Sequence, residues 1–107
     1  MNQNVKNIWI ESEEKGSIIG GQKLTDDNSD VIVTFADDHK FVATFFTYEN
    51  VITLTKNNRQ SGENISGLYF WASDMILIES LERINIEKVI TELIKKNLFE
   101  ELFKPCG

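Results

Sequence analysis

Short hydrophobic runs alternate with polar segments in the first half of the chain, a pattern that predicts β-strands. Residues 7–12, 31–35 and 40–46 are rich in the β-branched and aromatic side chains that strands favour. Residues 36–39 (Ala-Asp-Asp-His) predict a tight connection, because an aspartate in a turn can bond nearby backbone. We therefore expect the second and third runs to form an antiparallel hairpin. The glycine-rich residues 16–21 predict either a further hairpin or an open loop.

Two stretches have the spacing of helices. The first begins at Thr47, a good N-cap residue, continues with side chains three and four positions apart, and ends near Gly62. The second begins with Asn85 as its cap, and a shorter helical turn follows at 98–103 before Pro105. The apolar stripe of this second helix consists of Ile86, Val89, Ile90, Leu93 and Ile94.

Two apolar runs between these helices, residues 67–71 and 75–78, have the length of strands. Residues 76–78 predict the central strand, because a continuous apolar run is typical of burial on both faces. The predicted element order is β-β-β-α-β-β-α. This order favours one α+β domain over residues 1–107, with two helices packed against a mostly antiparallel sheet.

The composition agrees with a small folded domain. A chain of 107 residues is long enough for one core, and 41% hydrophobic residues are too many for a disordered chain. No apolar run approaches the roughly 20 residues of a membrane span, and the polar start does not resemble a signal peptide. The single cysteine, Cys106, excludes an internal disulfide. We therefore expect a cytoplasmic protein that does not contact a membrane.

The negative charge is concentrated in one part of the chain. Residues 11–38 carry eight carboxylates and two lysines, a net charge of −6 that equals the charge of the whole chain. We call the eight carboxylates the acidic block: Glu11, Glu13, Glu14, Asp26, Asp27, Asp30, Asp37 and Asp38. The block is either a solvated surface or a binding site for a basic partner. Because it repels phosphates, we expect no binding to nucleic acid by the protein alone.

The candidate catalytic residues lack the neighbours that catalysis needs. Residues 16–23 resemble a phosphate loop, but Lys23 comes one position too late. His39 is the only histidine and is interpreted as a turn residue, while Cys106 lies too near the end to be enclosed. Asp74 is interpreted as a turn cap. We therefore expect no enzymatic activity, cofactor or metal. Four aromatic residues could stack on bases: Trp9, Tyr69, Phe70 and Trp71. They are interpreted as core residues, because residues 65–78, which include the last three, contain no Lys or Arg.

Three segments and the closing helix carry a resemblance to a known group of bacterial proteins. The segments are Phe-Val-Ala-Thr-Phe-Phe-Thr-Tyr-Glu-Asn at 41–50, Ser-Gly-Glu at 61–63, and Gly-Leu-Tyr-Phe-Trp-Ala-Ser-Asp-Met at 67–75. Across residues 30–103 the chain resembles immunity proteins of contact-dependent growth inhibition and related polymorphic toxin systems. The resemblance implies a cytoplasmic antitoxin that binds the C-terminal toxin domain of a cognate effector and blocks its active site. The toxin implied is a nuclease, with a ribonuclease expected first, and no catalytic residues are implied for this chain.

The resemblance and the charge lead to one hypothesis about the binding site. A nuclease presents a basic groove to its substrate, and an acidic domain can occupy such a groove. We therefore predict that the acidic block binds the toxin domain, with the loop at 57–64 as the alternative interface. The alternative function is a non-enzymatic acidic module that binds another basic protein. The sequence leaves the chemistry of the toxin and the oligomeric state open.

Overall fold

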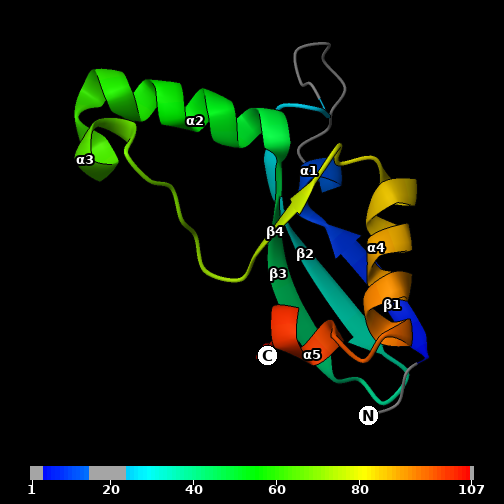
Figure 1. Ribbon diagram of the computed structural model, residues 1–107. Coiled ribbons are helices and arrows are strands. Elements are labelled where there is room, and N and C mark those ends of the chain that lie inside the picture. Colours follow the sequence, from blue (N-terminus) through cyan, green and yellow to red (C-terminus); the bar gives the residue numbers. More distant parts are fainter. Residues whose placement is uncertain (1–3, 15–23, 107) are drawn as a thin grey trace.

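The structure, a computed structural model, describes residues 4–14 and 24–106. A curved sheet forms the centre of the molecule, and four of its strands lie in the order β1-β2-β3-β4 (Figure 1). Its strands are β1 (Val5–Ile10), β2 (Asn28–Phe35), β3 (Lys40–Thr47), β4 (Met75–Ile78) and β5 (Lys104–Cys106). Pairing is antiparallel except that β4 runs parallel to β3, and β5 pairs with the other half of the same edge of β3.

The helices take two different positions around this sheet. They are α1 (Glu11–Glu14), α2 (Tyr48–Ser61), α3 (Glu63–Gly67), α4 (Arg83–Lys95) and α5 (Phe99–Leu102). Helices α4 and α5 lie against one face of the sheet, whereas α2 and α3 project away from it (Figure 1). The α+β class is therefore confirmed. The expectation that both helices pack against the sheet is wrong for α2, which leaves the sheet and buries only Asn50.

The core lies between the sheet and the two helices that cover it. Alternate residues of β2 and β3 point inward, as the two-residue period of strands requires. Phenylalanine rings fill the end nearest α5, where Phe99 packs edge-on against Phe35 at 5.2 Å and Phe41 at 5.4 Å and stacks on Phe103 at 4.3 Å. The predicted stripe of α4 is confirmed, because Ile86 and its neighbours one turn apart are buried in this core.

The hairpin and the first long helix form as the sequence predicts. The amide of Asp38 donates to the carbonyl of Phe35 (2.8 Å), and the carboxylate of Asp37 accepts from the amide of His39 (3.2 Å). Helix α2 begins at Thr47, whose hydroxyl accepts from the amide of Asn50, and ends at Gly62 in the left-handed conformation (φ 88°). Local turn and capping chemistry therefore determines these boundaries.

Three sequence predictions are wrong. Residues 67–71 form no strand, and β4 lies at the edge of the sheet rather than at its centre. The continuous apolar run of β4 reflects contact with the core on one side only, since Leu77 on the other side is 42% exposed. Asn85 is not a cap either, because α4 begins earlier and Asn85 donates to the hydroxyl of Ser80 (2.7 Å). The predicted loop or hairpin at 16–21 lies outside the described residues.

No helix in the described part of the chain is long and apolar enough to cross a membrane.

Candidate functional site

The acidic block is divided between the two ends of β2. Its members at one end are Glu11, Glu13 and Glu14 on α1 together with Asp26, Asp27 and Asp30, and those at the other end are Asp37 and Asp38. The eight residues of β2 span about 25 Å at the usual rise of a strand. The structure therefore does not gather the eight predicted residues into one compact site.

Most of the block holds neighbouring segments together through uncharged groups. Asp26 accepts from the side-chain amide of Asn50 (3.1 Å) and the hydroxyl of Thr53 (3.0 Å), which fastens α2 to the segment before β2. Asp30 accepts from the hydroxyl of Thr44 (2.7 Å) across the β2–β3 pair. Three more members accept such bonds: Glu11 from the amide of Asp30, Glu14 from the indole of Trp9, and Asp27 from the amide of Asn28. The bonds of Asp26 and Asp30 are made to uncharged groups and leave the negative charge of these two carboxylates unneutralised.

Three members of the block face a basic side chain. Glu13 forms two hydrogen bonds with the guanidinium of Arg83 (2.8 and 3.0 Å), and these bonds lower the pKa of Glu13. Hydrogen bonds from His39 and from Lys6 lower the pKa values of Asp37 and Asp38 respectively. A partner that bound these three carboxylates would have to compete with contacts already made within the chain.

Helices α2 and α3 form an arm, residues 48–67, that ends in an unusual turn. The residues Asn64, Ile65 and Ser66 have φ values of 51–52°, so that one turn of α3 is left-handed. Three successive residues other than glycine in this region cost about 1–2 kcal/mol each. Gly67 follows with φ 78°, and its Cα lies so close to α2 that an added Cβ would be 2.7 Å from Cγ of Arg59. The turn directs the chain outward before it returns to β4.

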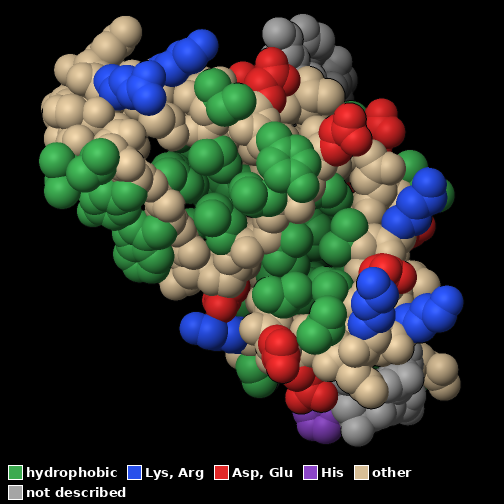
Figure 2. Space-filling model, in the orientation of Figure 1, with side chains coloured by type: hydrophobic (Ala, Val, Ile, Leu, Met, Phe, Trp, Pro, Cys, Tyr) green, Lys and Arg blue, Asp and Glu red, His purple; other side chains and the backbone are tan. Residues whose placement is uncertain are grey.

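Large hydrophobic side chains are exposed along this return path. We call them the front surface: Ile65, Leu68, Tyr69, Trp71 and Leu77. Leu68 and Trp71 are 74% and 66% exposed. Figure 2 shows hydrophobic side chains gathered over α3 and over the middle of the same face, where β4 lies. Exposed apolar groups that gather in this way mark interaction sites more often than scattered ones do.

The interpretation of the aromatic residues as core is therefore wrong for two of the four. Tyr69 and Trp71 are exposed, whereas Phe70 packs edge-on against Phe46 (5.5 Å between ring centroids) and Trp9 is half-buried. The sequence offers one weak signal of this outcome, namely a run of aromatic residues without the alternation of a strand directly after a glycine. The predicted alternative interface at 57–64 lies on the arm beside the front surface.

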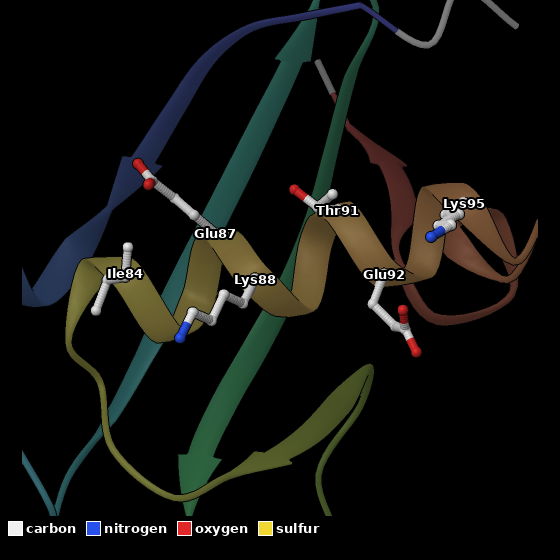
Figure 3. Close-up of a pocket in the computed structure, with 6 residues that line it drawn as sticks. All are labelled: Ile84, Glu87, Lys88, Thr91, Glu92 and Lys95. Carbon is white, nitrogen blue, oxygen red and sulfur yellow. The ribbon is translucent and has the colours of Figure 1, made fainter.

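Two surface hollows do not have the character of ligand sites. The first lies along the outer face of α4, and all of its lining residues come from that helix: Ile84, Glu87, Lys88, Thr91, Glu92 and Lys95 (Figure 3). Its charges alternate in sign, and Glu92 pairs with Lys96 one turn on (2.9 Å), as on an ordinary solvated helix face. The second hollow brings His39 near Cys106, but Nδ1 of His39 is already paired with Asp37 (2.8 Å).

Among the described residues, no group of three or more His, Cys, Asp or Glu side chains is arranged to hold a metal ion. Asp74, the predicted turn cap, has a positive φ of 52° and pairs with Lys104 (3.3 Å). The strongest candidate for a functional site is therefore the front surface together with the acidic end of β2.

Comparison with protein-family models, curated proteins and solved structures finds no significant match to this chain.

Proposed function

We propose that this chain is a non-enzymatic protein-binding module, and that it acts as the immunity protein of a contact-dependent growth inhibition or related polymorphic toxin system. Its partner is then the basic nuclease domain, expected to be a ribonuclease, at the C-terminus of the cognate effector. The observation that carries the proposal is the front surface, where aromatic and aliphatic side chains are exposed from the end of the arm to β4. Trp and Tyr are the residue types that contribute most binding energy at protein interfaces.

The electrostatics support a basic partner. The chain has a net charge of −6, and the members of the acidic block that bond only uncharged groups keep a negative field at one end of β2. Such a field accelerates the encounter with a positively charged domain. The resemblance of residues 30–103 to immunity proteins supports a toxin domain as that partner.

Co-expression with the toxin domain encoded beside this chain tests the proposal. We expect the wild-type chain to restore growth and to co-purify with the toxin domain. Trp71→Ala should weaken the complex about 30-fold, because a central aromatic anchor contributes about 2 kcal/mol. Ile84→Ala is the matched control, since Ile84 is 55% exposed on α4 and lies outside the front surface.

Two results would contradict the proposal in different ways. If the wild-type chain neither protects cells nor co-purifies with the toxin domain, the immunity function is wrong. If both variants protect and bind as well as the wild type, the front surface is not the interface.

A further inference from the structure

We propose that the free edge of β4 binds an extended strand of another protein, and that this incoming strand carries Lys or Arg beside Glu79. The inference deepens the proposed function, on which it rests for the identity of the partner, by stating how that partner is held. It follows from the backbone of β4, from the contrast with the other exposed strands, and from the charges that flank β4.

The backbone of β4 has hydrogen-bonding groups that point away from the sheet. Residues of a parallel strand direct their backbone groups to alternate sides. The amide of Thr44 donates to the carbonyl of Asp74 (2.9 Å), so Asp74, Ile76 and Ile78 bond β3 while Met75 and Leu77 point outward. Within the described part of the chain, the outward amides and carbonyls of Met75 and Leu77 have no partner. They are therefore available to a further strand.

The other exposed strands are protected against such pairing. Strand β1 carries Lys6, has a register irregularity between Val5 and Asn7, and its Ile8 carbonyl accepts from Nη2 of Arg83 (2.9 Å). Strand β5 contains Pro105, which has no amide hydrogen. Lysines, bulges and prolines are the devices by which proteins block an edge strand. The sequence of β4, Met-Ile-Leu-Ile, contains none of them.

The charges that flank β4 determine which kind of strand fits. Asp74 precedes the strand and already pairs with Lys104 (3.3 Å), whereas Glu79 follows the strand and has no ion-pair partner among the described residues. Pairing of β4 with β4 of a second copy would bring together two chains that each have a net charge of −6, and their repulsion opposes such a dimer. An incoming strand with Lys or Arg beside Glu79 has the complementary charge. A basic partner is therefore favoured over self-association.

A peptide of the stated chemistry tests this inference on the full chain. The probe is Lys-Val-Thr-Val-Thr-Val-Lys, blocked at both ends, and the matched control peptide has Glu in place of both Lys residues. We expect millimolar probe to shift the amide resonances of Met75 and Leu77 in the ¹⁵N-labelled protein and to slow their hydrogen exchange. The control peptide should bind about tenfold more weakly, because its end charges are repelled.

A pair of variants separates the backbone contribution from that of the side chain. Leu77→Pro removes an outward amide but leaves the bonds to β3 intact, and should weaken probe binding about tenfold. Leu77→Thr shortens the apolar side chain while keeping the amide, and should weaken it less. Should Leu77→Pro fail to fold, hydrogen exchange of the wild-type chain still decides the question.

The outcomes distinguish this inference from the proposed function. If Met75 and Leu77 are unaffected by the probe, or if shifts occur only at residues 64–71, the docking edge is wrong. Dimerisation of the free chain that protects the same amides would assign the edge to a second copy and overturn the inference. If the chain protects cells from the toxin but hydrogen exchange of the Met75 and Leu77 amides is not slowed in the complex, the proposed function stands and the docking edge is wrong. If the probe binds at β4 but the chain does not protect cells from the toxin, the docking edge stands and the immunity function is wrong.

Discussion

Asp26 is expected to hold the arm in place, and its removal tests that role. Its two carboxylate oxygens accept from Asn50 and Thr53 on the first turns of α2. Asn50 is 8% exposed and also accepts from the side-chain amide of Asn28 (2.9 Å). Asp26→Ala therefore leaves a buried amide hydrogen of Asn50 without its acceptor.

The magnitude follows from these contacts. Hydrogen bonds to a charged group contribute about 1.5–3 kcal/mol when shielded from water, and an unsatisfied buried donor costs about 1–3 kcal/mol. Because Asp26 is itself half-buried, we take the lower end and expect a loss of about 2 kcal/mol. For a domain of this size the midpoint of thermal unfolding should fall by about 10 °C. The midpoint in urea should fall by about 1 M at unchanged slope.

Circular dichroism of thermal and urea unfolding measures both quantities. Asp38→Asn is the matched control from the acidic block, since it removes the exposed ion pair with Lys6 but keeps a residue type that tolerates the positive φ of 70° at this position; we expect little change in either midpoint. Asp26→Asn should recover part of the loss, because its remaining oxygen can still accept from one donor. A midpoint for Asp26→Ala equal to that of the wild type would refute the reasoning, and Asp26 would then be free to serve a partner.

Three further predictions concern the core, the arm and an ion pair. Phe99→Ala should destabilise the protein by about 4 kcal/mol in urea unfolding, because it removes a fully buried ring; a loss below about 2 kcal/mol would contradict the described packing. Gly67→Ala should lower the thermal midpoint more than Gly62→Ala, since both have positive φ but only the Cβ at position 67 would meet other atoms; equal effects would refute this. Glu13→Gln should unfold a few degrees below the wild type at pH 7, because the hydrogen bonds from Arg83 depress the folded pKa of Glu13 and the resulting stability is fully present above the unfolded value of 4.5. The difference should shrink as the pH falls from 4.5 through the folded pKa, and a difference that stays constant as the pH is lowered below 4.5 would contradict the assignment.

Elements defined by local chemistry could be predicted from the sequence. The hairpin around Asp37, the start of α2 at Thr47 and its end at Gly62 depend on side chains only a few positions away. The apolar stripe of α4 is equally local, because it depends on periodicity alone. For these elements the sequence contains the whole physical cause.

The errors concern elements whose environment depends on distant parts of the chain. The run at 67–71 has the composition of a strand, but the left-handed turn before it leads the chain away from the sheet, where no strand pairs with it. β4 lies at an edge because no further strand of the described chain pairs with its other side, which nothing near residue 75 encodes. The division of the acidic block by the length of β2 is likewise a property of the fold.

The carboxylates of the acidic block have two roles that the sequence does not separate: they form hydrogen bonds within the fold, and they create a negative field around it. Asp26 and Asp30 bond neutral groups at short distances, so reversing their charge would also remove contacts that hold α2 and β3. Loss of binding in such variants would not show that they touch a partner. On the proposed function, salt is the cleaner probe, because a field that extends about 8 Å at physiological ionic strength affects chiefly the association rate. The edge of β4 and the front surface act only in contact, so they should determine the dissociation rate. We therefore expect added salt to slow association of the wild-type chain with the toxin domain, and Trp71→Ala to speed dissociation at any salt concentration.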